Sequence, residues 1–80
     1  MKKENIKTLQ QCLEVIEGFQ TILETMSQIE QETFDELSDT YQNSEKGITH
    51  QEQLDCLQEA VDNLNEIISN CYSVIDMEEY

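Results

Sequence analysis

Apolar residues recur at steps of three and four along the first half of the chain, which is the spacing of one face of an α-helix. This row consists of Ile6, Leu9, Leu13, Ile16, Phe19, Leu23 and Met26. A second apolar set lies beside it and consists of Cys12, Val15, Ile22 and Ile29. The combined stripe is wider than the narrow seam of a two-stranded coiled coil. We therefore predict one long helix, from about residue 5 to residue 38, with a broad apolar face.

The second half of the chain carries the more regular pattern. Steps of three and four continue without a break through Leu54, Leu57, Val61, Leu64, Ile68, Cys71 and Ile75. Coiled-coil helices show this periodicity. Acidic and amide side chains fill most of the remaining positions, so one face is apolar and the other polar. This pattern predicts a second helix from about residue 49 to residue 77.

Between these helices the chain collects short polar side chains and a glycine, which disfavour helix continuation. They are Ser38, Asp39, Thr40, Asn43, Ser44 and Gly47. We predict a turn over residues 39–48. Thr49 and Glu52 form a capping-box pattern for the second helix, and Ser44 is a competing cap about one turn earlier. The predicted fold is an all-α antiparallel helical hairpin, with residues 1–80 forming a single domain.

Folding at this turn would set Phe34 near Leu57 and Leu23 near Ile68. Two helices cannot cover two broad stripes, and an exposed apolar patch of this kind marks an interface. We therefore predict that two hairpins pair into a dimeric four-helix bundle. The predicted self-association stripe consists of Ile16, Phe19, Leu23, Met26, Leu57, Val61, Leu64, Ile68 and Ile75.

The charge balance narrows the range of partners. The chain has 18 acidic residues, 4 lysines and no arginine, for a formal net charge of −14. Three of the lysines, Lys2, Lys3 and Lys7, lie in the first seven residues. Without a basic patch, direct binding to nucleic acid or to anionic membranes is disfavoured. The densest acidic cluster is a candidate partner surface and consists of Glu30, Glu32, Asp35, Glu36 and Asp39.

Three cysteines without a CxxC motif, and a beginning without a secretory signal pattern, favour a reducing cytoplasm. No apolar run approaches the roughly 18 residues expected of a membrane span. Cys12 and Cys71 fall on or beside the apolar stripes and are expected to behave as small buried hydrophobes. Gly18, in the middle of the first helix, either permits a close approach of helices or has no special role.

Catalytic and metal-binding patterns are missing from the sequence. The only histidine, His50, is not preceded by glutamate at the spacing of a di-metal bundle site, and we expect it to face solvent at the start of the second helix. The alternating ligands of an EF-hand are also missing. Cys56 lies six residues from His50 and on another helical face, so a thiolate nucleophile is not expected. We predict a protein that is not an enzyme and uses no metal or cofactor.

The central part of the chain resembles a family of short, acidic bacterial and phage proteins with no established activity. The resemblance rests on the segments EQETFDELSDTYQNSEKG and EAVDNLNEIISN. The matching positions are Glu30, Gln31, Glu32, Phe34, Asp35, Leu37, Gln42, Ser44, Glu45, Lys46 and Gly47. The chain departs from the pattern at Ser38, where many members have proline. The resemblance implies a helical hairpin and a phage or mobile-element setting, and it implies no particular function.

Two functions from different classes fit these features. The first is a small protein–protein interaction module that self-associates through its apolar stripes and binds an unidentified protein partner. The alternative is a phage-type acidic inhibitor, whose carboxylates imitate nucleic-acid phosphates and block a nucleic-acid-binding protein. A secreted helical-hairpin substrate is a third and weaker candidate, because the Trp-x-Gly turn of the best-known class is missing.

Overall fold

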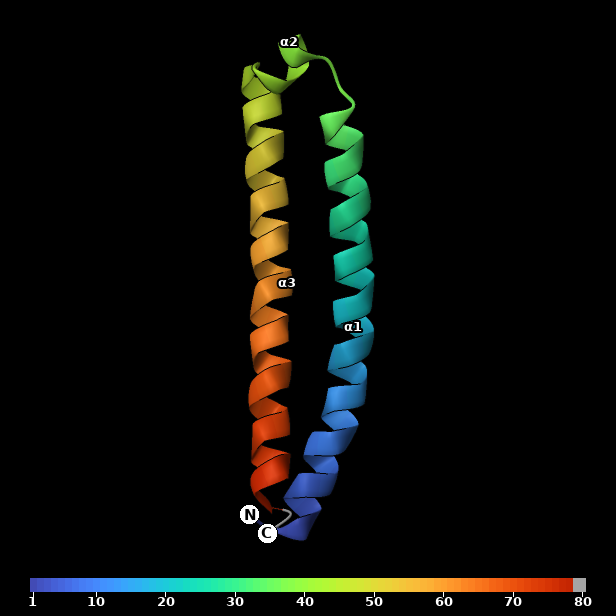
Figure 1. Ribbon diagram of the computed structural model, residues 1–80, viewed down its shortest axis with the longest axis vertical. Coiled ribbons are helices and arrows are strands. Elements are labelled where there is room, and N and C mark those ends of the chain that lie inside the picture. The colour runs from blue at the N-terminus through green and yellow to red at the C-terminus, as the bar shows by residue number, and fades with distance from the viewer. Residues whose placement is uncertain (79–80) are drawn as a thin grey trace.

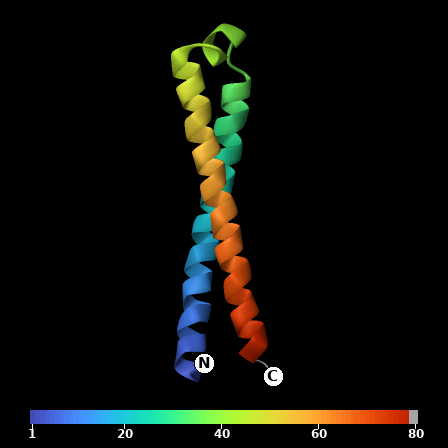
Figure 2. The same ribbon diagram turned by 90° about the vertical axis from the view of Figure 1, so that its left-hand side faces the viewer.

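The computed structural model describes residues 1–78, and all regular structure in this range is helical. Two long helices, α1 (Lys3–Asp35) and α3 (Glu45–Glu78), lie side by side and antiparallel, and the short helix α2 (Asp39–Gln42) joins them at one end (Figure 1). The molecule is a rod with principal extents of 57 × 15 × 15 Å. Viewed from the side, α1 and α3 cross near their mid-length (Figure 2). The prediction of an all-α fold is confirmed.

A continuous row of buried and half-buried residues runs along each long helix. In α3 this row keeps steps of three and four throughout and consists of Gly47, His50, Leu54, Leu57, Val61, Leu64, Ile68, Cys71 and Ile75. In α1 it consists of Ile6, Leu9, Leu13, Ile16, Gln20, Leu23, Ser27, Gln31 and Phe34. We refer to the contact between these two rows as the seam. The hydrophobic residues that become buried in it are few: Leu13, Phe34, Leu54 and Val61.

Side-chain hydrogen bonds across the seam set the alignment of the two helices. The Gln20 side-chain amide donates to Asn65 Oδ1 at 3.0 Å, and the Ser27 hydroxyl donates to Gln58 Oε1 at 3.2 Å. Ser27 is buried, so a shifted register would leave its hydroxyl without a partner, and this favours the observed register over its alternatives.

The predicted register is wrong. Phe34 was expected near Leu57, but its ring lies against that of His50, about two helical turns earlier in α3, with the centroids 4.9 Å apart. The difference arises at the reversal of the chain. There α2 takes up four residues and α3 begins at Glu45, four residues before the predicted start of the second helix.

The helix ends differ from the prediction for a local reason. The Ser44 hydroxyl accepts the backbone N–H of Gly47 at 3.1 Å, so Ser44 caps α3 and Thr49 lies inside that helix. The Thr49 capping box is therefore wrong as a helix start. The first helix ends at Asp35 rather than near residue 38, because Ser38 caps α2 by accepting the backbone N–H of Tyr41 at 3.2 Å.

Ser44→Ala is expected to lower the free energy of unfolding by about 1 kcal/mol, since it removes the cap of α3. Thr49→Ala is the matched control. It exchanges a β-branched residue for a better helix former inside the same helix, so we expect no loss of stability. Urea unfolding followed by circular dichroism measures both changes. Equal losses in the two variants would argue against Ser44 as the cap.

Gly47 is buried inside α3 and has an ordinary helical backbone conformation. A Cβ atom at this position would contact the carbonyl oxygen of Tyr41 and lie 2.7 Å from that of Gln42. The missing side chain therefore lets the backbone of α2 rest on α3. Gly18 differs, because a Cβ there would meet nothing within 4 Å. The idea that Gly18 permits a close helix approach is wrong, and Gly47 has that role.

Candidate protein-interaction surface

A second row of apolar side chains on α1 remains exposed. It consists of Cys12, Val15, Phe19, Ile22, Met26 and Ile29, and we refer to it as the outer row. Val15, Phe19, Ile22 and Ile29 are each 57–63% exposed, and Met26 is 42% exposed. The steps are again three and four, so these six residues share one helical face. The outer row is the largest periodic set of exposed apolar residues in the described chain.

The position of the outer row on α1 explains why α3 does not cover it. Successive residues of an α-helix are about 100° apart, which sets the outer row roughly 110° around α1 from the row in the seam. Shallow hollows occur along it. One is lined by Thr21, Ile22, Thr25, Met26, Ile29 and Glu30, and another by Thr8, Gln11, Cys12, Val15 and Ile16.

The surroundings of the outer row carry little charge, although the protein is strongly acidic. Among residues 8–29, only Glu14, Glu17 and Glu24 are charged. Glu17 accepts a hydrogen bond from Tyr72, and Glu24 accepts one from Gln20 at 2.8 Å, so both lie along the seam and away from the outer row. The core of a protein–protein interface is typically depleted of charge, because charged groups are costly to desolvate.

The seam has one polar flank and one apolar flank. Gln31 of the seam bonds with Gln51, and Tyr72 bonds with Glu17, which places Gln51, Tyr72 and Glu17 on the polar flank. Helical periodicity puts Phe19 and Met26 of α1 on the opposite flank, next to a row of uncharged residues of α3. That row consists of Gln53, Ala60, Ile67 and Val74. The outer row therefore lies next to an uncharged edge of α3.

The hydrogen bond between Tyr72 and Glu17 affects the titration of the tyrosine. The pKa of Tyr72 is raised above 10.0 by the hydrogen bond to Glu17, by desolvation and by the negative charge of that carboxylate. The folded-state pKa exceeds the unfolded one. The contact therefore contributes stability at pH values below about 10, and this contribution is lost as the pH rises through the folded-state pKa.

Subtracting the ultraviolet titration of Tyr72→Phe from that of the wild type isolates the ionisation of Tyr72. Its midpoint is expected above pH 10.0, the ordinary value for tyrosine. Glu17→Gln removes the carboxylate and should bring the midpoint back toward the ordinary value. A wild-type midpoint at or below that value would contradict the contact.

The structure divides the nine residues of the predicted self-association stripe into two groups. Phe19 and Met26 lie on the outer row and are exposed. The other seven are buried or half-buried along the seam and consist of Ile16, Leu23, Leu57, Val61, Leu64, Ile68 and Ile75. Val15, Ile22 and Ile29 belong to the outer row, although the sequence pattern placed them only beside the main stripe.

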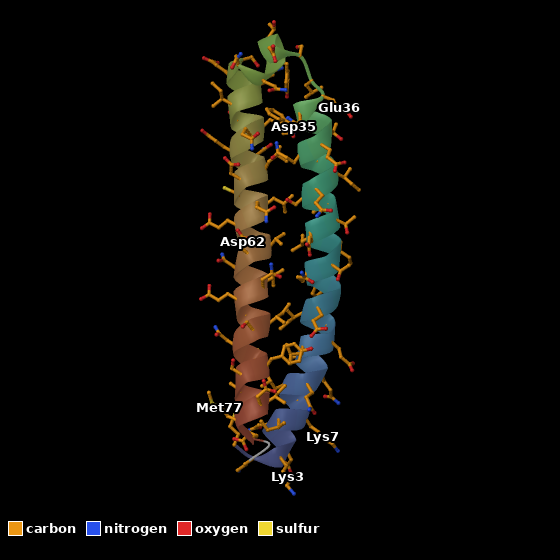
Figure 3. All side chains as sticks on the ribbon, viewed as in Figure 1. Lys3, Lys7, Asp35, Glu36, Asp62 and Met77 are labelled. Carbon is orange, nitrogen blue, oxygen red and sulfur yellow. The ribbon has the colours of Figure 1, made fainter. Side chains whose placement is uncertain are left out.

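The predicted acidic partner surface lies at the hairpin end near the turn. Its five residues, Glu30, Glu32, Asp35, Glu36 and Asp39, are all exposed. Figure 3 shows Asp35 and Glu36 near this end, and Lys3 and Lys7 near the opposite end of α1. The two ends of α1 therefore differ in charge. Within residues 1–78 the only ion pair joins the amino terminus to Glu78 at 2.6 Å.

Carboxylates also form a row along α3. Glu52, Asp55, Glu59, Asp62 and Glu66 follow steps of three and four and are all exposed. At 1.5 Å per residue the row is roughly 21 Å long. The described chain offers these five carboxylates no ion-pair partner, so the row is a continuous negative edge on the outside of α3.

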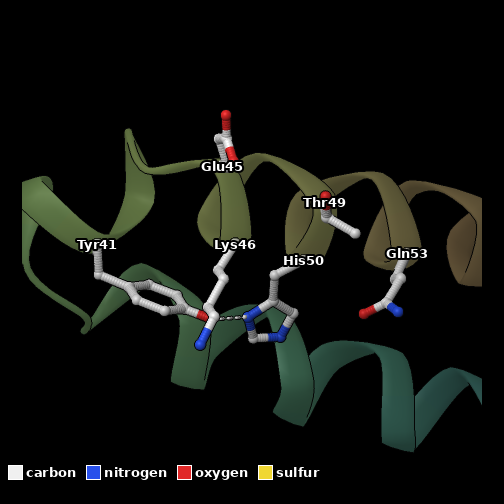
Figure 4. A pocket seen from close by; sticks show the side chains of 6 residues that line it. All are labelled: Tyr41, Glu45, Lys46, Thr49, His50 and Gln53. Carbon is white, nitrogen blue, oxygen red and sulfur yellow. Dashed lines mark hydrogen bonds between the residues drawn. The ribbon is translucent and has the colours of Figure 1, made fainter.

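A hollow at the hairpin end is lined by Tyr41, Glu45, Lys46, Thr49, His50 and Gln53 (Figure 4). The Tyr41 hydroxyl lies 3.3 Å from His50 Nδ1, and the His50 ring meets Phe34 edge to face. The expectation that His50 faces solvent is wrong, because the ring is half-buried between Tyr41 and Phe34. These contacts hold α2 against α3.

The three cysteines are free thiols. Cys12 is exposed on the outer row, so its expected burial is wrong, whereas Cys71 is half-buried in the seam. Within residues 1–78 no group of three or more histidine, cysteine or acidic side chains converges as a metal site would. In the same range no helix has the length and apolar character needed to cross a membrane.

Comparisons with protein families, with characterised proteins and with solved structures gave no match. The resemblance to short acidic bacterial and phage proteins therefore stays a prediction.

Proposed function

We propose that this chain is a non-catalytic protein–protein interaction module that pairs with a second copy of itself through the outer row. The observation that carries the proposal is an exposed apolar row, without charge along its length, on a protein with a net charge of −14. Two copies can bring these faces together while their carboxylates stay in water. In this way the pairing avoids most of the repulsion between two acidic molecules.

A second copy of the chain is a suitable partner for the outer row, because one hairpin buries little apolar surface by itself. Four buried hydrophobic residues within residues 1–78 form a small core for a chain of 80 residues. Chains of this size commonly gain stability by oligomerisation when they have no disulfide or metal. Pairing two hairpins would give the four-helix bundle predicted from the sequence, with the outer rows and the uncharged edges of α3 inside it.

The proposed dimer is reversible. Complete burial of a large apolar side chain contributes about 1.5–3 kcal/mol, and the side chains of the outer row contribute less than this because the hairpin already covers part of each one. The loss of translational and rotational freedom on association offsets much of this gain. The dimer should therefore dissociate on dilution.

Co-purification tests the proposal. A tagged copy, mixed with an equal amount of an untagged copy and captured on resin, is expected to retain up to about one untagged chain for every two tagged chains, because exchange of a two-fold symmetric dimer is random. Ile22→Thr in both copies shortens the most exposed side chain of the outer row and should reduce this recovery several-fold. Equal recovery with Ile22→Thr, or no recovery with the wild type, would contradict pairing through the outer row.

The acidic surfaces would remain outside such a dimer and would be available to an unidentified protein partner. The exposed thiols of Cys12 and Cys56 fit the reducing cytoplasm that the sequence favours. Under this proposal the dimer presents two copies of each acidic surface, which strengthens binding to any partner that has two sites.

The second candidate function, an acidic inhibitor that imitates nucleic acid, is favoured by the carboxylate row of α3. Five carboxylates over roughly 21 Å give one charge per about 5 Å, compared with one per about 3.4 Å along one DNA strand. A nucleic-acid-binding groove with regularly spaced cations could bind this edge. Such binding would weaken steeply with salt.

Competition with duplex DNA tests this second function. Proteins captured from a bacterial lysate at low salt should be released by added duplex DNA and by a rise in salt. A control chain carries Glu52→Gln, Asp55→Asn, Glu59→Gln, Asp62→Asn and Glu66→Gln, and it should capture none of them. Capture that resists both DNA and salt would contradict the mimic.

A further inference from the structure

We infer that the two copies pair with α1 antiparallel to α1 of the second copy, about a two-fold axis near residues 20 and 21. This inference rests on the proposed self-association through the outer row. Closed dimers are usually two-fold symmetric, so each copy contributes the same surface. Such a surface must be complementary to itself, and the outer row has this property.

The spacing of the outer row is the same when read from either end. Its six residues follow steps of three, four, three, four and three, and the centre of the row lies between Phe19 and Ile22. In an antiparallel pair, Phe19 of one copy lies opposite Ile22 of the other. Val15 then lies opposite Met26, and every residue of the row has an apolar partner.

The sizes of the side chains also favour this alignment. The antiparallel pairs join a larger side chain with a smaller one: Phe19 with Ile22, Met26 with Val15, and Ile29 with Cys12. Facing positions that combine large and small side chains fill an interface evenly. A parallel, in-register pair would set Phe19 against Phe19 and Cys12 against Cys12, crowding one layer and leaving space in another.

The charges at the two ends of α1 provide an independent argument. Lys2, Lys3 and Lys7 lie at its start, whereas the acidic cluster lies at its end. The antiparallel alignment brings the start of α1 in each copy beside the end of α1 in the other, so lysines lie near carboxylates. A parallel alignment would set lysine beside lysine and carboxylate beside carboxylate, which like-charge repulsion disfavours.

Cross-linking with a short bismaleimide tests the alignment. The background chain carries Cys56→Ser and Cys71→Val, so that Cys12 is its only thiol. In the antiparallel pair the two Cys12 residues lie roughly 25 Å apart along the helix, beyond reach of the reagent. Residue 29 of the other copy lies opposite Cys12. Ile29→Cys in this background should therefore change the product from monomer to a covalent dimer of twice the mass.

Two controls separate the alignments. The background chain with Cys12 alone, and the chain with Cys12→Ser and Ile29→Cys, should both remain monomeric on a denaturing gel. Within one chain, positions 12 and 29 are also roughly 25 Å apart, so an internal cross-link cannot form. If Ile29→Cys weakens the noncovalent dimer, Val15→Cys with Met26→Cys in a Cys12→Ser background tests the same alignment.

Covalent dimer in either single-thiol control would show a parallel pair and overturn the inference, leaving the proposed self-association intact. A noncovalent dimer that no two-thiol variant can cross-link would place the interface outside the outer row, and it would overturn both the inference and the pairing surface proposed above. A wild-type chain that light scattering finds to be monomeric would instead overturn the proposed function. The three failures are therefore distinguishable.

Discussion

Phe19→Asp is expected to leave the helical hairpin folded and to abolish its self-association. Phe19 is 59% exposed in the hairpin, so the substitution removes little of what holds α1 to α3. In the proposed dimer the substitution would bury an unpaired carboxylate in each copy, and it would also remove the apolar contacts of the Phe19 ring. We expect the dimer to weaken by at least about 3 kcal/mol, which is more than about 100-fold in Kd. Light scattering gives the mass, and circular dichroism gives the helix content.

Ile48→Asp is the matched control for this prediction. Ile48 is 53% exposed on α3, away from the outer row, so the same change of chemistry should leave the mass of the dimer unaltered. Leu64→Asp would not be informative, because Leu64 is half-buried in the seam and its replacement disturbs the hairpin itself. Equal behaviour of Phe19→Asp and Ile48→Asp would contradict the assignment of the interface to the outer row.

Gly47→Ala is expected to lower the free energy of unfolding by about 2–3 kcal/mol. The added methyl group would press on the carbonyl oxygens of Tyr41 and Gln42, so α2 must move away from α3. Overpacking of this kind typically costs about 1–3 kcal/mol, and loosening α2 also weakens the contact of Tyr41 with His50. The melting temperature should fall by about 10–20 °C for a domain of this size.

Gly18→Ala is the control, and its effect should have the opposite sign. Gly18 is exposed in the middle of α1 and has open space where the methyl group would lie. The substitution should therefore raise the free energy of unfolding by about 0.5–1 kcal/mol through helix propensity alone. Both melts must be recorded at one protein concentration, because self-association would stabilise the folded chain. A melting temperature raised by Gly47→Ala would contradict the close packing of α2 on α3.

The long helices follow from periodicity, but the reversal between them does not. Apolar steps of three and four over many turns predict helices whatever the details of the connection. By sequence, Ser44 and Thr49 are both suitable caps for the start of the second long helix. Which of them is the cap depends on the packing of α2 on Gly47, and the local sequence does not reveal this tertiary contact. The predicted register is wrong for the same reason, since the path of the chain through α2 decides which residues of α3 lie opposite α1.

The outer row was only partly predictable. The width of the apolar stripe indicated that part of it would stay exposed, but the pattern did not show which part. Gln20 and Ser27 occupy seam positions, but the apolar periodicity of the sequence runs through their neighbours Phe19 and Met26 instead. Only their partners on α3, Asn65 and Gln58, explain why a polar side chain can lie in the seam. The pattern of apolar residues along the chain does not reveal such pairings between residues that are distant in the sequence.

Sedimentation equilibrium of the wild-type chain over a range of concentrations tests the central claim most directly. Self-association through the outer row predicts a mass close to twice that of one chain at about 100 µM, falling toward that of one chain as the protein is diluted to about 1 µM or below. A single-chain mass at every concentration, with full helix content, would contradict the claim.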